Sequence, residues 1–553
     1  KPESDAPDVV TPDPNSATPV PDKNSTGPPP TTVKSANQID DDKLPAAEYL
    51  SVVDDYPQAL NQLADHLARQ LPPDSGELVW LFDQSQNMID DRGIISQNLQ
   101  EMYLQYSLRM KYYFDLESDV PPPLTTIISF GQNLSLHTQK STSDLGAIRK
   151  SIDQIPVDES GQENMCGALA TTLKLLAPAA SRSKRKLAII LVTDESGDDG
   201  DSVEDVVNLA KKFETPIIIL GRETNFGSPF SQLRWFDGKS KLTHWLRINR
   251  GPETAGLECL QWNGFHSRRD VFGSGLGPFE QVRIAKESGG IFFMLPGEEE
   301  NILAVGVGNR RRSNLIPMSE YLPDLRSRKE YEQARQQSPF RRQIWNIIQT
   351  LNPNIDSKLD FGLMYYSMTP SEFRQQATQE IQAAWRAMTL VETALSTLEE
   401  IRPLRTEETS KRWQASYDLI TAQLTTYRVR LFQFILVMDR HVTKPSKPKD
   451  TKSNKWHAVR VRTTIDPDEQ EFERIKSAYR LSASHPGFLQ EIKAAQTQAK
   501  TLSEFVIAEH PGTPWAQQAT FEWTTGYGVK LVDRFIDPRY LNNLDKDIKL
   551  PKR

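Results

Sequence analysis

The sequence is poor in the residues from which several kinds of site are built. Only two of its 553 residues are cysteine and only eight are histidine. At most one disulfide bond can therefore form, and the scattered histidines indicate core or surface positions rather than a cluster of metal ligands. Long hydrophobic runs are missing too. The longest candidate, residues 431–438, is interrupted by Gln433 and falls short of the roughly 18 apolar residues that a membrane-spanning helix needs.

Motifs for common kinds of catalysis and for nucleic-acid binding are missing as well. The sequence contains no G-x-S-x-G, no H-E-x-x-H and no Gly-rich phosphate loop of the Walker type. The net charge is −7, and the basic residues are mostly spread among acids rather than interleaved with aromatic residues in a basic run. We therefore expect neither an enzyme nor a nucleic-acid partner.

The composition divides the chain into segments. Residues 1–45 are dominated by Pro, Ser, Thr, Asp and Asn, and such a segment cannot bury enough apolar area to offset the entropy of ordering it. We predict a disordered tether (1–45), an α/β domain (46–300), a helical region (301–442), a linker (443–464) and a C-terminal helical module (465–553).

The tether bears on where the protein works. A segment of this kind commonly follows a secretion signal or a lipid or membrane anchor. We therefore expect an extracytoplasmic protein that is secreted, periplasmic or held at the cell surface, with any anchor removed from the chain as given. The chain itself is not expected to span a membrane.

Strand and helix patterns alternate between residues 46 and 300. Apolar runs of strand length occur at 77–82, 124–131, 133–138, 186–193, 216–220 and 290–295, and helical patterns lie between them. Asp201 is the expected N-cap of the helix that begins at 202. The alternation predicts a doubly wound, mainly parallel sheet, which binds ligands beyond the carboxyl ends of its strands.

Two apolar stripes predict a helical hairpin after residue 300. The first helix is expected to begin at Pro370, with Thr369 as its cap. The stripes recur at alternating spacings of four and three residues, and comprise Ala384, Met388, Val391, Leu395 and Leu398, then Trp413, Tyr417, Ile420, Leu424, Tyr427, Leu431, Phe434 and Met438. We predict that they form an internal core rather than a docking surface, in an otherwise all-α region.

Short oxygen-bearing side chains follow the first predicted strand. Asp83, Ser85 and Asn87 come at every second position after an apolar run, and Asp194 directly follows Thr193 at the end of a later strand. In the predicted sheet these strand ends lie side by side, at the edge where ligands bind. Two interpretations remain open: a polar strand end that turns into a loop, or a metal site.

At these residues the sequence resembles the von Willebrand factor type A family. The metal-ion-dependent adhesion site of that family combines a D-x-S-x-S motif after the first strand, a Thr in a loop before a helix with an Ala-Leu pair, and an Asp after the fourth strand. Asp83 and Ser85 fit the first motif, with Asn87 in place of its second Ser, and Asp194 fits the last position.

The resemblance extends over about residues 77–297 and implies a variant of that site. Aligning Ala168 and Leu169 with the Ala-Leu pair puts Glu163 where the Thr stands. Each replacement keeps an oxygen donor, so the implied cofactor is Mg²⁺, Mn²⁺ or Ca²⁺. Three carboxylates around one divalent ion imply tight capture and a less electrophilic metal. The implied ligands are Asp83, Ser85, Asn87, Glu163 and Asp194.

A long insert, at about residues 222–278, separates two predicted strands. Because it leaves the carboxyl end of a parallel strand, it must rise over the sheet edge that carries the implied metal ligands. Unusually long connections are often functional, and Trp and Arg are enriched at binding hot spots. The candidate partner-binding residues are Trp235, Trp245, Trp262, Arg247 and Arg250. The alternative is that the tryptophans form a small core that holds the insert to the sheet.

The two cysteines bear on this insert. Cys259 lies inside it and Cys166 follows Glu163 by three residues. A disulfide between them could fix a lid over the metal, but the Cα atoms would have to approach within about 7 Å. Two buried, unbonded thiols are the alternative that we favour.

These features favour a binding protein. We expect an adhesion protein or assembly scaffold that recognises another protein through or beside its metal, with an acidic side chain of the partner as a possible contact, and that uses its helical region as a scaffold. The alternative function is an assistant of a chelatase or of an ATPase-driven remodelling machine, in which type A domains also occur. The sequence leaves the oligomeric state open.

Overall fold

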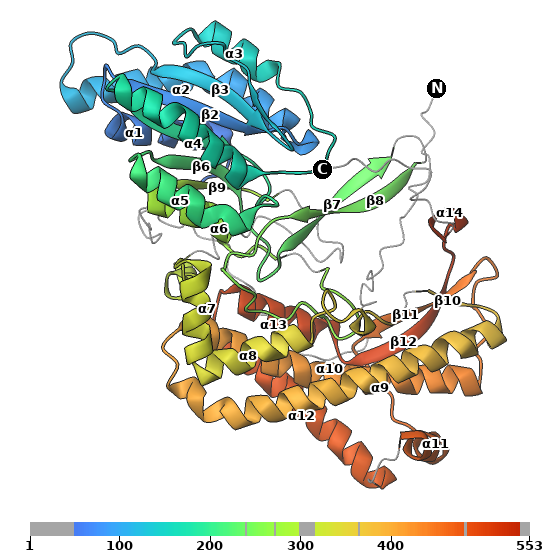
Figure 1. Ribbon diagram of the computed structural model, residues 1–553. Coiled ribbons are helices and arrows are strands. Elements are labelled where there is room, and N and C mark those ends of the chain that lie inside the picture. Colours follow the sequence, from blue (N-terminus) through green and yellow to red (C-terminus); the bar gives the residue numbers. More distant parts are fainter. Residues whose placement is uncertain are drawn as a thin grey trace, which may run out of the picture.

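The computed structural model describes residues 49–237, 241–269, 272–297, 316–362, 365–479 and 484–541. The predicted tether at 1–45 lies outside the described residues. Figure 1 shows a part built around a central sheet, a second part built mainly of helices, and a β-hairpin at the junction of the two. Within the described ranges, no helix has both the length and the apolar composition needed to cross a membrane.

The central sheet has seven strands in the order β1-β9-β6-β5-β2-β3-β4. All neighbouring pairs are parallel except β3 and β4. This mainly parallel arrangement confirms the predicted fold class. The strands are β1 (Leu50–Val52), β2 (Gly76–Asp83), β3 (Leu124–Phe130), β4 (Leu134–Leu136), β5 (Lys186–Val192), β6 (Ile217–Arg222) and β9 (Phe292–Leu295).

Helices cover both faces of the sheet because its central strands are apolar on both sides. Along β2, Leu78, Trp80 and Phe82 pack with α1, α2 and α3, whereas Val79 and Leu81 pack with α4, α5 and α6. The helices on the first face are α1 (Tyr56–Gln70), α2 (Ile89–Phe114) and α3 (Leu145–Asp153), and those on the second are α4 (Met165–Arg182), α5 (Val203–Lys212) and α6 (Phe279–Ser288).

The predicted cap of α5 is wrong. A short 3-10 turn, Gly200–Ser202, precedes the helix, and Ser202 is the N-cap residue without a side-chain cap bond. Asp201 therefore lies inside the turn rather than at the cap. The extra turn moves the start of the helix by one residue, which is enough to displace the predicted capping pair.

The insert leaves β6 and forms a two-stranded antiparallel hairpin of β7 (Phe230–Asp237) and β8 (Leu242–Asn249). An irregular segment then runs from residue 250 to α6, with residues 270 and 271 outside the description. The hairpin extends from the junction between the two parts of the molecule (Figure 1). The insert was predicted from its length, but its strands were not.

The second part is largely helical, and its longest helices form the predicted hairpin. α9 and α10 are joined by a short connection and pack against each other. Both apolar stripes lie in one buried cluster, which confirms their predicted role as core. The helices are α7 (Arg328–Gln337), α8 (Pro339–Thr350), α9 (Pro370–Ile401), α10 (Lys411–Thr443), α11 (Glu469–Tyr479), α12 (His485–Glu509), α13 (Pro514–Thr525) and α14 (Pro538–Leu541).

This region also contains a three-stranded antiparallel sheet, so it is not all-α as predicted. β11 (Lys455–Val461) lies between β10 (Tyr365–Ser367) and β12 (Gly528–Arg534). β11 falls in the predicted linker and β12 in the predicted helical module. Each strand is short, and they pair across about 70 to 90 intervening residues, so no local pattern identifies them as partners.

Candidate functional site

The candidate site lies where β2 and β5 end beside each other. Asp83 is the last residue of β2, and Asp194 follows β5 by two residues. The Ser85 Oγ is 3.5 Å from the Asp194 Oδ1. Asp83 is fixed on both oxygens, because it accepts a hydrogen bond from the Ser85 amide at 2.7 Å and another from the Thr193 hydroxyl at 2.7 Å. The predicted neighbourhood of the two strand ends is therefore present.

Glu163 reaches the same edge from the loop that precedes α4. The carboxylate of Asp198 accepts the Glu163 amide at 3.0 Å, and the Asp198 amide donates to the Glu163 carbonyl at 2.8 Å. Asp199 accepts the amides of Cys166 and Gly167 in the first turn of α4. The acidic loop after β5 thus holds the Glu163 loop in place.

The carboxylate of Glu163 is buried without a hydrogen-bond partner. The residue is 4 % exposed, and neither Oε1 nor Oε2 has a partner in the described structure. Burial raises the pKa of Glu163 well above its usual value, and the nearby carboxylates of Asp83 and Glu195 raise it further. Burial also raises the pKa of Asp83 to about 7, with a further contribution from the Asp194 carboxylate. Asp83, Glu163 and Asp194 are here named the sheet-edge cluster, and the negative charges of their carboxylates repel one another.

The donors at this edge fit a divalent cation of the Mg²⁺, Mn²⁺ or Ca²⁺ type. They are carboxylates and neutral oxygens, without imidazole or thiolate, and the unsatisfied Glu163 oxygens are the clearest sign of an available ligand. Among the described residues, no three His, Cys, Asp or Glu side chains converge closely enough to hold a metal by themselves. A site here therefore needs neutral oxygens, which Ser85 and Asn87 carry. Asn87 lies in the 3-10 turn after β2 and is partly exposed.

Sequence reasoning missed the role of Thr193, which orients Asp83. Its hydroxyl donates to the Asp83 Oδ2 across the two strand ends. The signal was present in the sequence, because Thr193 stands directly between the apolar run of β5 and Asp194. A hydroxyl at that place can reach the neighbouring strand end, where Asp83 lies.

The insert covers this edge, as its point of departure predicted. The Ser196 amide donates to the Asn249 carbonyl at 2.9 Å, and the Asn249 amide donates to the Glu195 Oε2 at 3.1 Å. The next residue, Arg250, places Nη2 at 3.5 Å from the Asp194 Oδ2. Asp83, Ser85, Glu163 and Asp194 are at most 7 % exposed under this cover.

The five candidate partner-binding residues separate into two groups. Trp262 is fully buried, donates its indole N–H to the Leu359 carbonyl and meets the ring of Tyr427 edge to face. Arg250 is only 2 % exposed. Both side chains therefore belong to the interior, which for Trp262 is the alternative that the sequence left open.

The other three candidates lie on the hairpin. Trp235 and Trp245 are partly buried, and Arg247 is exposed. The guanidinium of Arg247 lies over the ring of Phe230, 3.3 Å from its centroid. In the hairpin register Trp245 pairs with Arg234 and Arg247 with Gln232, so these two share one face, whereas Trp235 pairs with His244 on the opposite face. The hairpin is therefore where contact with a partner remains sterically open.

Cys166 and Cys259 are both buried and are not bonded to each other. Burial raises the pKa of the Cys259 thiol to about 12. This is the alternative that the sequence favoured. The cover over the sheet edge is thus held by hydrogen bonds and ion pairs rather than by a disulfide.

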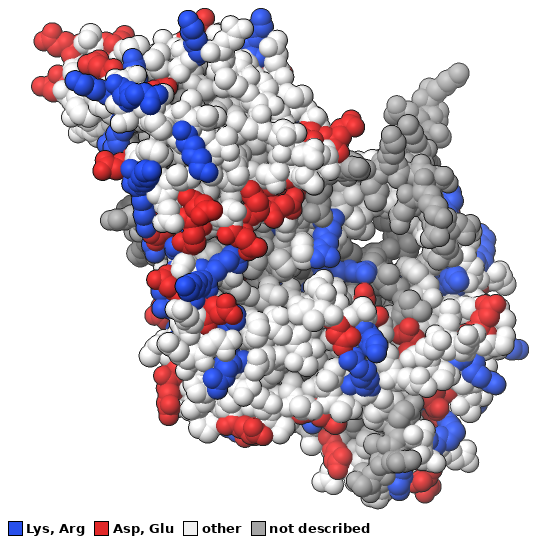
Figure 2. Space-filling model, viewed as in Figure 1, with Lys and Arg blue, Asp and Glu red and all other residues white. Residues whose placement is uncertain are grey.

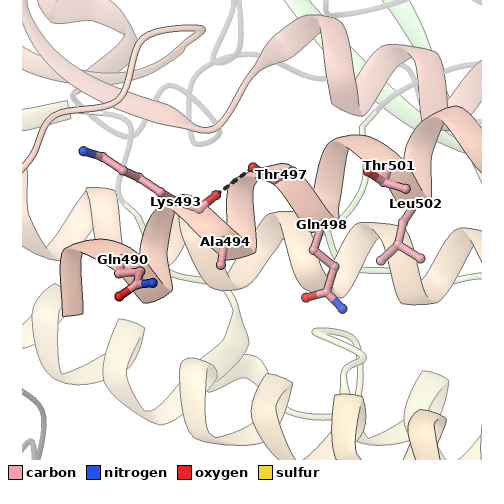
Figure 3. Close-up of a pocket in the computed structure, with 7 residues that line it drawn as sticks. All are labelled: Gln490, Lys493, Ala494, Thr497, Gln498, Thr501 and Leu502. Atoms are coloured by element: carbon pink, nitrogen blue, oxygen red, sulfur yellow. Dashed lines mark hydrogen bonds between the residues drawn. The ribbon is translucent and has the colours of Figure 1, made fainter. Parts of the chain in front are cut away.

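The molecule has another concave place, a shallow groove along α12 with a volume of about 590 Å³. Figure 3 shows that the labelled residues come from one helix, and the hydroxyl of Thr497 turns back to the Lys493 carbonyl. Neutral side chains dominate the lining, so it lacks the paired charges of the sheet edge. Its residues are Gln490, Lys493, Ala494, Thr497, Gln498, Thr501 and Leu502.

Charged side chains are mixed over the face shown in Figure 2. Lys and Arg lie among Asp and Glu, both on the sheet part and on the helical part. No extended surface of one sign is seen on this face. On this face, electrostatic attraction of a partner therefore has to come from small groups of residues.

Residues 77–233 match the family model of the von Willebrand factor type A domain. No curated protein matches the chain. Among solved structures, proximal thread matrix protein 1 from the mussel byssus is 20 % identical over 27 % of this chain and 37 % of that chain, with a TM-score of 0.20.

Two other solved structures are similar to part of the chain. A structure of the same mussel protein with a zinc-occupied MIDAS motif is 17 % identical over 27 % of this chain and 37 % of that chain, with a TM-score of 0.22. The pilus adhesin SpaC from Lactobacillus rhamnosus GG in its open conformation is 15 % identical over 50 % of this chain and 30 % of that chain, with a TM-score of 0.20. The chain thus spans less than two fifths of each of these three structures.

Proposed function

From the von Willebrand factor type A domain that residues 77–233 form, we propose that the chain is an extracytoplasmic, metal-dependent protein-binding protein. Its helical region serves as the scaffold of an adhesion or assembly complex. The proposal gives the chain no catalytic role and no nucleic-acid partner. It also assigns a divalent cation to the sheet-edge cluster.

The observation that carries the metal part is the buried carboxylate of Glu163. An ionisable group at 4 % exposure with two unsatisfied oxygens is costly unless a cation accompanies it. Asp83, Glu163 and Asp194 would hold that cation together with the oxygens of Ser85 and Asn87. When bound, the cation would neutralise the acids and offer an electrophilic centre to an oxygen ligand.

The partner is recognised beside the metal rather than directly on it. The sheet-edge cluster lies under the insert, whereas Trp235, Trp245 and Arg247 stand on the hairpin that the insert forms. Aromatic and Arg side chains supply much of the binding energy at protein interfaces. Arg247 suits an acidic side chain of the partner.

The extracytoplasmic location rests on the composition of residues 1–45. A segment rich in Pro, Ser and Thr before a folded domain is typical of tethers at cell surfaces and in secreted proteins. The location is tested by fractionating cells that express the complete natural protein. Recovery in the cytoplasm alone contradicts this part of the proposal.

Metal binding is tested by calorimetry on the full chain after removal of metals with a chelator. Titration with Mg²⁺, Mn²⁺ or Ca²⁺ should show one divalent site, and Asp83→Asn should abolish the heat. The matched control is Asp119→Asn, because Asp119 has an 87 % exposed side chain and pairs only at the surface with Lys111. Absence of heat with all three ions contradicts the metal-dependent proposal.

Protein binding is tested by affinity capture with the full chain as bait. Capture is performed with Mg²⁺, with EDTA, and with the Asp83→Asn chain. A partner that is retained only by the metal-loaded natural chain supports the proposal. Capture of an ATPase whose activity the chain changes favours instead the alternative role in a remodelling machine.

A further inference from the structure

Arg250 brings a buried positive charge directly to a carboxylate of the sheet-edge cluster. Its side chain is 2 % exposed, and Nη2 lies 3.5 Å from the Asp194 Oδ2. Two other buried arginines near this edge are directed elsewhere. Arg92 donates to the backbone carbonyl of Asp83, and Arg222 pairs with Asp91 at 2.6 Å. Among these three described arginines, Arg250 is thus the one whose guanidinium contacts the carboxylate of a candidate metal ligand.

The segment around Arg250 is fixed on both sides. On one side, Asn249 bonds to the loop after β5 through the Ser196 amide and the Glu195 carboxylate. On the other side, Glu253 accepts a hydrogen bond from Arg412 of α10 at 2.9 Å. Three residues therefore separate a contact with the sheet edge from a contact with the helical region.

We propose that Arg250 determines the cation affinity of the sheet-edge cluster, because its guanidinium and a bound divalent cation compete for the carboxylate of Asp194. This inference rests on the proposed metal site and adds to it a residue that the family motif does not contain. Binding of a cation breaks the ion pair and loosens residues 249–250 from the loop after β5. Removal of the guanidinium charge strengthens cation binding.

The charge at this edge decides the direction of the effect. A positive charge at the cluster repels a divalent ion, and the repulsion is poorly screened where the groups are buried. The ion pair with Asp194 must also be given up when the cation uses that carboxylate. Both contributions lower the affinity of the natural chain, so a neutral residue at position 250 raises it.

The experiment measures Mn²⁺ binding by calorimetry to the metal-free full chain and to three variants. Arg250→Gln should bind Mn²⁺ about tenfold or more tightly than the natural chain. Arg250→Lys keeps the charge and should remain within about threefold of the natural affinity. Arg402→Gln is the matched control, because it removes the same charge from a surface side chain that is 70 % exposed, and it should leave the affinity unchanged.

Each outcome of the titration has a separate meaning. Equal affinities of the natural chain and Arg250→Gln overturn the role of Arg250 while leaving the proposed metal site intact. An equal gain in Arg250→Gln and Arg250→Lys also overturns it, because altered packing rather than charge then explains the effect. Absence of Mn²⁺ binding in every chain contradicts the proposed metal site itself.

Hydrogen exchange of the natural chain tests the competition without any substitution. The amides of Ser196 and Asn249 are bonded across the contact between insert and sheet edge. Saturating Mn²⁺ should accelerate exchange in peptides that cover residues 195–199 and 245–251. Bound Mn²⁺ with unchanged or slower exchange in both peptides overturns the proposed competition.

Discussion

The molecule has two buried clusters that contain acidic residues, one at the edge of the sheet and one at the junction with the helical region. The two clusters differ in how far the chain itself pairs their acidic side chains. The junction cluster consists of Glu253 and Glu258 of the insert, Arg412 of α10 and Tyr331 of α7. Arg412 bonds to both carboxylates at 2.9 Å, and the Tyr331 hydroxyl donates to Glu258 at 2.7 Å. The charged side chains are at most 3 % exposed.

The sheet-edge cluster is buried to a similar degree but is not completed by the chain. Arg250 approaches Asp194 at 3.5 Å, whereas both oxygens of Glu163 remain without a hydrogen-bond partner among the described residues. The pKa values record the contrast. Burial alone would lower the pKa of Arg412, but the carboxylates of Glu258 and Glu253 outweigh burial and raise this pKa. At the sheet edge, burial raises the pKa of Glu163, and the neighbouring carboxylates raise it further.

The comparison separates a structural cluster from a candidate ligand site. Both contain buried acidic side chains, which the insert covers at the sheet edge and supplies at the junction, so neither the presence of acids nor their burial distinguishes the two clusters. What differs is whether the chain supplies enough positive charge and hydrogen bonds to the acids. A cation is therefore expected at the sheet edge and not at the junction.

The largest expected effect comes from breaking the junction cluster. Arg412→Met leaves Glu253 and Glu258 buried without the positive charge of the guanidinium. Removal of one partner from a buried ion pair costs about 3–5 kcal/mol. We expect the free energy of unfolding, measured with urea, to fall by that amount. Arg402→Met is the control, because Arg402 has a 70 % exposed side chain and pairs with an equally exposed Glu399.

A compensating variant shows whether the lost free energy comes from unpaired charge. Arg412→Met combined with Glu253→Gln and Glu258→Gln removes all three charges. We expect it to recover stability relative to Arg412→Met, because replacing a complete buried ion pair is far less costly than removing one member. If the triple variant is no more stable than Arg412→Met, packing of the Arg412 side chain explains the loss.

The same substitution should have opposite results in the two clusters. In EDTA, Glu253→Gln should lower the free energy of unfolding by about 1–3 kcal/mol, because it weakens hydrogen bonds that Glu253 accepts from Arg412 and from the Gly227 amide. Glu163→Gln should leave that free energy unchanged or raise it, because no hydrogen bond is lost and an unpaired acid is removed. Urea denaturation of both variants measures the difference.

Addition of Mn²⁺ then sharpens this contrast. The natural chain should gain about 2.7 kcal/mol at a metal concentration a hundredfold above the dissociation constant. Glu253→Gln should gain as much, whereas Glu163→Gln should gain less because it loses a charged ligand. Equal losses of stability for the two Glu→Gln variants in EDTA would show that the sheet edge is satisfied without a cation.

The sequence predicted the parallel sheet because its signals are local. Each central strand is a continuous apolar run, and parallel strand ends meet at one edge, so Asp83 and Asp194 could be placed together before the structure was known. Strand β1 was missed because it spans only Leu50–Val52 and pairs with β9, which lies about 240 residues later. β11 was missed because the Lys/Pro-rich stretch before it indicated a linker.

The roles of the insert residues could not be read from the sequence. Trp262 is buried because Leu359 and Tyr427, which come about 100 and 165 residues later, enclose it. Arg250 meets Asp194 through the path of an irregular segment that no periodic pattern describes. Residue composition therefore identified the insert as a place of interest, but only the packed structure separates its interior side chains from its exposed ones.

His66 shows a third way to bury an ionisable group, and its expected effect is the smallest of these at neutral pH. Its Nε2 is buried without a hydrogen-bond partner in the described structure. Burial lowers the pKa of His66 from 6.5 to about 4, Asp65 opposes the shift and Arg69 adds to it. Unlike the acids of the junction cluster, which are paired, and those of the sheet-edge cluster, which the chain pairs incompletely, this group remains neutral.

The consequence is a loss of stability in mild acid. Between pH 6.5 and pH 4 the unfolded chain protonates His66 while the folded chain does not, so the free energy of unfolding falls as the pH is lowered through that range. Below about pH 4 both states are protonated and the contribution stops changing. Urea midpoints of the natural chain and His66→Gln should therefore diverge between pH 7 and pH 4, with the natural chain losing more. Parallel midpoints over this range would show that His66 is solvated in the folded state, and that neutral burial is not a third solution in this molecule.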